Sequence, residues 1–213
     1  MLQSRIIQSY LNYRPSWQWI VEQSGLPYLP VDIKVPYKEI YQEWLSVSDQ
    51  AVAHREGNYG LLGNQGWLSL SLYGIDSTNT IDSIPGKMQW TLIAQKCPLT
   101  VQWLQENFVI DSSTGRIRFM LLEPGGIIAP HSDRDFKQLA EVNIAIYHPE
   151  QSVFRFKNYG NIPFVSGKAF IIDTSNEHMV VNNSDQPRLH IIVHSDLINK
   201  NLITQSYENR LHY

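Results

Sequence analysis

The chain of 213 residues is 43% hydrophobic and 17% charged, with a formal net charge of -3 at pH 7. Its length suits one compact domain, and the weak negative charge argues against a general nucleic-acid or anionic-membrane binder, which needs a basic face. Cys97 is the only cysteine, so no internal disulfide forms. The amino end lacks the apolar core of a signal peptide, and no stretch approaches the roughly 20 apolar residues of a spanning helix. We therefore expect a cytoplasmic protein with no nucleic-acid or membrane partner.

The first 65 residues are expected to be helical or irregular and to pack against the rest of one domain spanning 1–213. Two sets of apolar residues in this part have helical spacing: Ile6, Ile7, Tyr10 and Leu11, and then Ile40, Trp44 and Leu45. Prolines at positions 15, 27, 30 and 36 keep these helices short, because proline lacks the amide hydrogen that a helix interior needs.

The periodicity becomes that of a strand at Gly66. Three leucines share one face of residues 66–73: Leu68, Leu70 and Leu72. The other face holds Trp67, Ser69, Ser71 and Tyr73. This alternation predicts a half-buried strand. Two helices are expected next, over 88–96 and 100–107, with Pro98 between them.

After Asp111 the sequence is dominated by β-forming residues. Runs rich in Ile, Val and Phe are separated by Gly, Pro, Asn and Asp: 116–122, 127–131, 142–147, 153–156, 169–172, 178–181 and 188–194. Short strands with turns between them predict a mainly β fold, a sandwich or a barrel, in which a closed or double-sheet arrangement limits exposed edges. The β core is expected over 66–195, followed by a C-terminal segment, 196–213.

Three residues in or just after two of these runs form a candidate metal site: His131, Asp133 and His178. Residues two apart on a strand point the same way, with Cα atoms about 6.6 Å apart, so His131 and Asp133 can bind one ion from a single segment. His178 must then come from another strand. Two imidazoles and one carboxylate on one side of a metal leave the opposite positions open, as in non-haem Fe(II) oxygenases.

Each of these residues also has a simpler interpretation. By itself, a His-x-Asp sequence binds a metal in roughly one case in ten. His178 alone is more often a hydrogen-bonded core histidine, and an arginine is more often a surface ion-pair former. Asp135 is a competing carboxylate, but a residue four positions from His131 along a strand is about 13 Å away, so Asp133 is the better ligand.

Arg188 follows His178 across a turn that ends at Pro187. If the two flank a hairpin, a turn centred on Asp185 leaves Arg188 about 13 Å along the strand from the residue opposite His178, and a turn centred on Ser184 leaves it about 7 Å away. A five-carbon dicarboxylate spans such a gap, with its 2-oxo acid end on the metal and its far carboxylate on the guanidinium. The spacing permits this role for Arg188 without establishing it.

Three motifs in the second half of the chain carry a family resemblance: Glu123-Pro124-Gly125-Gly126 leading to Pro130-His131-Ser132-Asp133, Gly167-Lys168-Ala169-Phe170-Ile171-Ile172-Asp173 leading to Glu177-His178, and Pro187-Arg188-Leu189. Together they resemble the aspartyl/asparaginyl β-hydroxylase family of 2-oxoglutarate-dependent oxygenases, to which some free-proline hydroxylases are also similar. The resemblance covers Arg118 to Ser195, and the combination is far more specific than any one motif.

The resemblance implies a double-stranded β-helix, a jelly-roll core with N-terminal helical elements packed against it. It implies Fe(II) held by His131, Asp133 and His178, and 2-oxoglutarate as a cosubstrate anchored by Arg188. No catalytic residue is expected beyond the metal ligands.

Two further residues are candidates for the cosubstrate pocket. Asn143 falls near the position where some relatives have a cosubstrate-contacting histidine, and a structural amide is the alternative. His190 shares a face with Arg188, and packing or solvent exposure is the alternative for it.

The function that the resemblance implies is hydroxylation of an amino acid, or of an amino-acid side chain in a peptide, with consumption of O2 and release of succinate and CO2. The modest chain length slightly favours a small molecule as substrate. Halogenation is disfavoured, because it needs a vacant metal position that Asp133 fills. The alternative from another class is a non-enzymatic β-sandwich binding protein with a structural metal or none. A structural zinc site normally has four ligands, often cysteines, and Cys97 lies in a different region.

Overall fold

A computed structural model describes residues 26–54, 63–80, 86–112, 114–133, 141–199 and Leu202. The α-helices are α3 (Tyr37–Leu45) and α4 (Pro98–Asn107), and the 3-10 helices are η1 (Ser48–Gln50) and η2 (Ala94–Lys96). The strands are β1 (Tyr28–Val31), β2 (Val52–Ala53), β3 (Gln65–Gly74), β4 (Gln89–Trp90), β5 (Ile117–His131), β6 (Glu141–Tyr147), β7 (Ser152–Phe156), β8 (Gly160–Asn161), β9 (Ala169–Ile172), β10 (His178–Asn182) and β11 (Arg188–His194).

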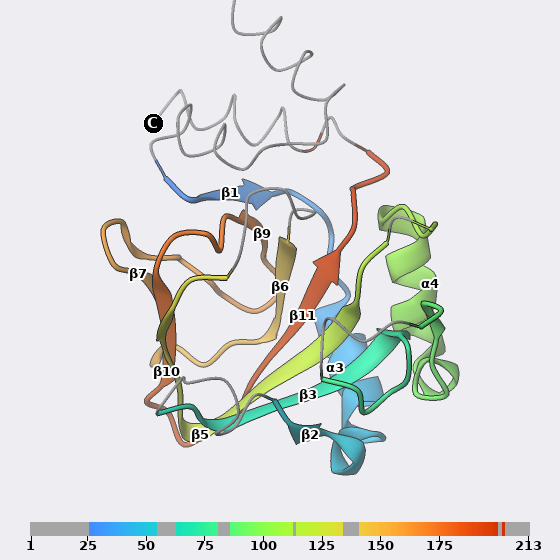
Figure 1. Cartoon of the computed structure of the whole chain (residues 1–213), viewed down its shortest axis with the longest axis horizontal. Coiled ribbons are helices and arrows are strands. Elements are labelled where there is room, and N and C mark those ends of the chain that lie inside the picture. Colours follow the sequence, from blue (N-terminus) through green and yellow to red (C-terminus); the bar gives the residue numbers. More distant parts are fainter. Residues whose placement is uncertain are drawn as a thin grey trace, which may run out of the picture.

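The long strand β5 belongs to two layers of antiparallel strands. Its first half pairs with β3 on one side and β11 on the other, and the larger layer continues through β6 and β9 to β1. Its second half pairs with β10, and the smaller layer continues through β7 to β8. Figure 1 shows β7 and β10 on one side of the molecule, across from β3, β5 and β11. This is the double-stranded β-helix that the family resemblance implies.

β5 passes from one layer to the other at a bend. Leu122 pairs with Arg188 of β11, whereas Ile127 already pairs with Val181 of β10. Gly125 has φ +71°, a conformation that favours glycine, and a Cβ on Gly126 would lie 2.7 Å from a methyl carbon of Leu122. The two glycines therefore permit the strand to fold over itself and to serve both layers.

Two apolar clusters lie on opposite faces of the larger layer. The outer cluster packs α3 and α4 against the sheet and includes Ile40, Trp44, Cys97, Leu104 and Phe119. The inner cluster lies between the two layers and includes Trp67, Leu122, Phe154, Phe156 and Phe164. The helices lie on the side of the larger layer away from β7 and β10 (Figure 1).

The alternation predicted for residues 66–73 is present in β3, with one difference. Leu70 and Leu72 join the outer cluster and Trp67 joins the inner one, so both faces of the strand are buried, rather than one face as predicted. Tyr73 lies in the outer cluster because the pairing of β3 with β5 shifts register between Ser71 and Tyr73. Helix 100–107 is confirmed as part of α4.

Two other segments differ from the sequence prediction. The expected helix over 88–96 is wrong: β4 pairs with the end of β3, and only Ala94–Lys96 is helical, as η2. The first 65 residues were expected to be helical or irregular, yet β1 joins the larger layer by pairing with β9, and β2 pairs with β3. Pro30 is tolerated in β1 because, among the described residues, β1 pairs with β9 alone and lies at the edge of the sheet. The helical spacing at Ile6 to Leu11 lies outside the described residues.

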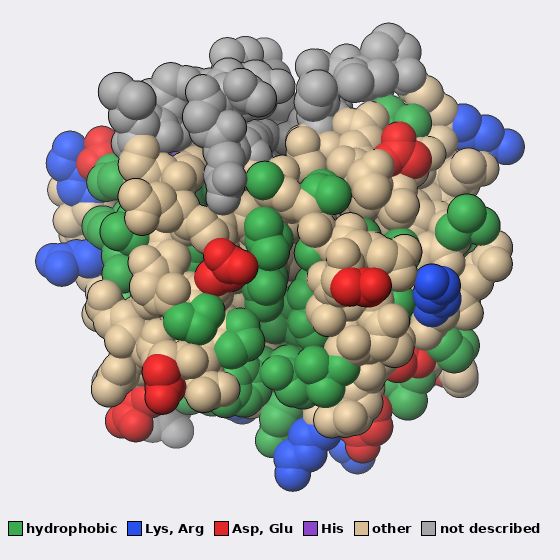
Figure 2. Space-filling view, turned by 90° about the horizontal axis from the view of Figure 1, so that it is seen from below, with side chains coloured by type: hydrophobic (Ala, Val, Ile, Leu, Met, Phe, Trp, Pro, Cys, Tyr) green, Lys and Arg blue, Asp and Glu red, His purple; other side chains and the backbone are tan. Residues whose placement is uncertain are grey.

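Neither described helix is both long and apolar enough to cross a membrane. Seen from below, hydrophobic side chains gather in a hollow at the centre of one face, with acidic side chains on both sides of it (Figure 2).

Candidate metal site and cosubstrate pocket

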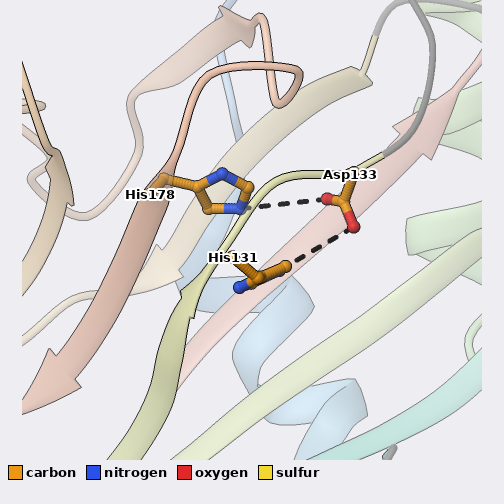
Figure 3. A group of neighbouring side chains, drawn as sticks. All are labelled: His131, Asp133 and His178. Carbon is orange, nitrogen blue, oxygen red and sulfur yellow. Dashed lines mark ion pairs between the residues drawn. The ribbon is translucent and has the colours of Figure 1, made fainter. Parts of the chain in front are cut away.

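The three predicted metal ligands converge at one end of the smaller layer. His131 is the last residue of β5, His178 is the first residue of β10, and the two are directly paired across the strands. Asp133 follows two residues after His131, and its backbone N–H donates to the Thr174 carbonyl at 2.9 Å. One potential ligand atom from each of the three side chains lies within 4.8 Å of the others (Figure 3).

Backbone carbonyl groups set the orientation of both imidazoles. Nδ1 of His131 lies 2.8 Å from the Ala129 carbonyl oxygen, and Nδ1 of His178 lies 2.9 Å from that of Asn176. A carbonyl oxygen only accepts, so each Nδ1 carries the hydrogen and each Nε2 presents a lone pair. This is how metal-binding histidines are held in proteins.

The Nε2 atoms face the carboxylate of Asp133 without bonding to it. Nε2 of His131 lies 3.8 Å from Oδ1, and Nε2 of His178 lies 3.8 Å from Oδ2, both beyond hydrogen-bond distance. Two imidazole nitrogens and a carboxylate oxygen are suitable donors for a divalent transition metal. The residues present therefore fit a metal ion.

Burial keeps His178 in its metal-binding form. Desolvation, followed by repulsion from a charged His131, lowers the pKa of His178, which favours the neutral imidazole. Phe154 stacks nearly parallel to the His178 ring, with centroids 5.2 Å apart, and Phe156 meets it with centroids 5.8 Å apart. The two phenylalanines hold the ring in place and exclude water from one side of it.

Arg188 is buried on the inner face of the larger layer. It is the first residue of β11 and is paired with Leu122, and only 3% of its surface is exposed. Nη2 lies 3.0 Å from Nδ1 of His190, while Nε is buried and makes no hydrogen bond within the described part of the chain. Burial lowers the pKa of Arg188 to about 9, so the side chain is still charged at pH 7.

A buried guanidinium with an unsatisfied donor favours an anionic ligand. Leaving such a group without a partner costs free energy, and a carboxylate removes this cost by accepting two parallel N–H bonds. The pocket around Arg188 is therefore suited to a carboxylate.

Aromatic contacts connect the Arg188 pocket with the metal ligands. Phe154 contacts both His178 and Phe164, and Phe164 meets the ring of His190 edge-on, with centroids 4.7 Å apart. On the other side, Trp67 lies 6.4 Å from the ring of His131. Both groups of polar side chains thus face the inner cluster.

The hairpin considered from the sequence is wrong. β10 and β11 are both described, and each pairs with β5, β11 before the bend and β10 after it, rather than with the other. The turn between them crosses from the smaller layer to the larger one. Arg188 nevertheless faces inward, because its partner Leu122 belongs to the inner cluster.

Asn143 and His190 lie together on the inner face. Oδ1 of Asn143 lies 2.5 Å from Nδ1 of His190, and both residues are almost completely buried. His190 shares a pocket with Arg188, as one of the two sequence interpretations predicted, and it is not exposed. Asp135, the competing carboxylate, lies outside the described residues.

Sequence reasoning missed His148. Its Nδ1 lies 2.9 Å from Nε2 of His190, although the two residues are 42 positions apart. No local spacing signals this contact, because His148 follows the end of β6 and reaches His190 only through the pairing of β6 with β11.

A family model for aspartyl/asparaginyl β-hydroxylase matches residues 35–196. A search of curated proteins finds no match. An oxidoreductase of the 2OG-Fe(II) oxygenase family from Burkholderia pseudomallei has a TM-score of 0.50 and 9% identity, over 84% of this chain and 89% of its own. A prolyl-4-hydroxylase from Pseudomonas putida has a TM-score of 0.48 and 10% identity, over 85% of this chain and 99% of its own. A viral collagen prolyl hydroxylase from Paramecium Bursaria Chlorella virus-1 has a TM-score of 0.47 and 12% identity, over 80% of this chain and 96% of its own.

At these identities, the Burkholderia structure supports the fold alone. The family model spans most of the chain and includes the three converging side chains and Arg188. The chain therefore belongs to the aspartyl/asparaginyl β-hydroxylase family and is a non-haem Fe(II)- and 2-oxoglutarate-dependent dioxygenase.

Proposed function

We propose that the enzyme hydroxylates a C–H bond of an amino acid, either free or as a side chain in a peptide, and releases succinate and CO2. In this proposal His131, Asp133 and His178 hold Fe(II), and Arg188 binds the far carboxylate of 2-oxoglutarate. Asn143 lines the cosubstrate pocket. A free amino acid is the favoured substrate.

One observation carries the proposal: two imidazole nitrogens and a carboxylate converge from the end of β5, the segment after it and the start of β10. The imidazole nitrogens are oriented by backbone carbonyls and are not hydrogen-bonded to the carboxylate that they face. When bound, Fe(II) supplies the activation of O2 that C–H hydroxylation needs. Three ligands on one side leave positions for a cosubstrate and O2.

The chain's own residues orient the reactants and exclude water. Arg188 offers a guanidinium that pairs two oxygens of a carboxylate, and this fixes the direction in which a 2-oxo acid points. Phe154 and Phe156 enclose His178 and help to keep the site dry. No side chain is required as a general acid or base.

The non-enzymatic alternative is wrong, since the chain belongs to a dioxygenase family. A structural zinc site with Cys97 has no support either, because Cys97 lies in the outer cluster and the three converging ligands face the inner one. Halogenation remains disfavoured because Asp133 supplies a carboxylate at the metal position that this reaction needs vacant.

The test is succinate release from protein loaded anaerobically with Fe(II) and 2-oxoglutarate and then exposed to O2. We expect slow turnover without substrate and faster turnover with one of the free amino acids. Asp133→Ala should abolish succinate release, and Arg188→Ala should need far more 2-oxoglutarate.

Two exposed residues provide matched controls, Asp185→Ala for the carboxylate and Arg155→Ala for the guanidinium. Both should turn over like the wild type. Equal turnover in the Asp133 variant would remove that residue from the metal site. Stimulation by peptides but by no free amino acid would assign the enzyme to peptide substrates.

A further inference from the structure

A chain of hydrogen bonds leads away from Arg188 through two histidines. Nη2 of Arg188 lies 3.0 Å from Nδ1 of His190. Nε2 of His190 lies 2.9 Å from Nδ1 of His148, and Nε2 of His148 lies 3.0 Å from the Ser152 carbonyl oxygen. The chain thus connects the start of β11 to the start of β7.

The carbonyl at the end of this chain fixes the direction of every bond. Because the Ser152 carbonyl only accepts, Nε2 of His148 carries a hydrogen, and Nδ1 of a neutral His148 must accept. His190 therefore donates from Nε2 and accepts at Nδ1. The acceptor at Nδ1 faces Arg188, whose guanidinium only donates.

The surroundings keep both imidazoles neutral. Burial, followed by the charge of Arg188, lowers the pKa of His148 to about 3 and that of His190 well below its usual value. Phe164 packs against both rings, with centroids 5.5 Å from His148 and 4.7 Å from His190. A protonated His190 beside Arg188 would bring two positive charges together in an apolar cluster.

The same argument orients Asn143. Oδ1 of Asn143 lies 2.5 Å from Nδ1 of His190, the atom that accepts from Arg188, so in this orientation of the amide two acceptors face each other. The two ends of an amide have nearly the same size, so the hydrogen-bond network decides which end faces a neighbour. An accepting Nδ1 requires the NH2 of Asn143 on that side.

We propose that His190 and His148 are positioning residues for 2-oxoglutarate, an inference that rests on the proposed role of Arg188. His190 binds one guanidinium N–H and thereby leaves Nε and the remaining donors of Arg188 directed at the far carboxylate. His148 acts one step further away, because it selects the tautomer of His190 that accepts from Arg188.

Substitutions of His190 separate its two nitrogens. His190→Asn places an amide oxygen where Nδ1 lies, so it keeps an acceptor for Arg188 and loses the bond to His148. His190→Gln extends toward the position of Nε2 and loses the acceptor. In calorimetric titrations of the Mn(II)-loaded protein, we expect His190→Asn to bind 2-oxoglutarate within about threefold of the wild type, and His190→Gln to bind it roughly tenfold more weakly.

Pyruvate distinguishes positioning from a general structural effect. It is a 2-oxo acid without a far carboxylate, so its affinity should be the same in the wild type and in both variants. Equal losses for pyruvate and 2-oxoglutarate would overturn the proposal.

A double-mutant cycle tests the role of His148. His148→Phe should weaken 2-oxoglutarate binding several-fold in the wild-type background, because the tautomer of His190 is then no longer selected. In the His190→Asn background it should have no effect, since an amide oxygen accepts without any selection of a tautomer. The same loss in both backgrounds would contradict the assignment.

The tautomers can be observed directly from nitrogen chemical shifts in ¹⁵N-histidine-labelled protein loaded with Zn(II), with signals assigned by the His148→Phe and His190→Asn variants. Both residues should carry their hydrogen on Nε2. A hydrogen on Nδ1 of His190 would refute the proposed direction of the hydrogen bonds from Arg188 to Ser152. If the wild type binds metal but no 2-oxoglutarate, the proposed function fails. If it binds 2-oxoglutarate and the two His190 variants have equal affinity, only the positioning role fails.

Discussion

The outer and inner clusters lie on opposite faces of one layer of strands, yet the polar groups in them differ in their hydrogen bonding. In the outer cluster, polar groups bond to one another: Trp103 donates to the Lys34 carbonyl, and Thr91 donates to the Ser71 carbonyl. In the inner cluster, Nε of Arg188 is buried without a hydrogen-bond partner among the described residues, and the ligand nitrogens of His131 and His178 converge on one point. The outer face is thus built for stability and the inner face for a ligand.

The largest expected effect is on the outer face. Trp44 is 3% exposed and its ring lies 5.1 Å from that of Phe119, so Trp44→Ala leaves a large cavity. We expect it to lower the free energy of unfolding by about 3–5 kcal/mol, measured by urea denaturation. Leu92→Ala, at a residue that is 75% exposed, is the control and should change little. Metal affinity of the folded Trp44 variant should match the wild type, and a large loss would break the separation of the two faces.

The next effect concerns the inner face and requires a metal. Mn(II) at a hundredfold excess over its dissociation constant should stabilise the wild type by about 2.7 kcal/mol, because only the folded protein assembles the three ligands. Asp133→Ala should lose most of this stabilisation at the same Mn(II) concentration, whereas Asp185→Ala should keep it. The measurement is thermal unfolding with and without Mn(II). Full stabilisation of the Asp133 variant would show that the ion binds elsewhere.

A smaller effect is expected between the two helices. α4 has no side-chain cap of its own, and Glu43 of α3 accepts from the backbone N–H groups of Leu99 and Thr100, both at 2.8 Å. Glu43→Ala should lower the free energy of unfolding by about 1–2 kcal/mol, as the loss of a helix cap does. Glu39→Ala changes an exposed carboxylate of the same helix and should have less effect. Equal losses in the two variants would mean that Glu43 does not act as the cap.

The smallest expected effect concerns Cys97, which should not react with a thiol reagent in the native protein. Burial raises the pKa of Cys97 to about 12, so at pH 8 the side chain is a thiol rather than the reactive thiolate. A thiol reagent should not modify the native protein at pH 8 and should modify it fully in urea. Rapid modification of the native protein would show that the outer cluster opens readily.

Local patterns predicted the parts of the fold that local sequence determines. The run 169–172 is β9. His131 and Asp133 lie close together, and Arg188 and His190 lie in one pocket, as expected from the side-chain period of 2 along a strand. The expected helix over 88–96 failed because Trp90 pairs with Tyr73, a contact 17 positions away along the chain. The spacing of apolar residues along the chain carries no signal of such pairing.

The candidate site divides in the same way. His131 and Asp133 are close in sequence and were predicted from their spacing, and His178 from its place in the motif. The route by which Arg188 reaches the inner face was not predictable, since it depends on β10 and β11 pairing with different halves of β5. His148 was missed for the same reason, because its partner His190 lies on another strand.

The bend at Gly125 and Gly126 has a consequence for the choice of 2-oxo acid. β5 ends at His131 and, before the bend, pairs with Arg188, so one continuous backbone sets the distance between the proposed metal and the proposed anchor. The distance between these two backbone positions does not change when a side chain changes rotamer. With these roles, we expect the enzyme to discriminate between 2-oxo diacids by length and to bind a six-carbon homologue more weakly than 2-oxoglutarate.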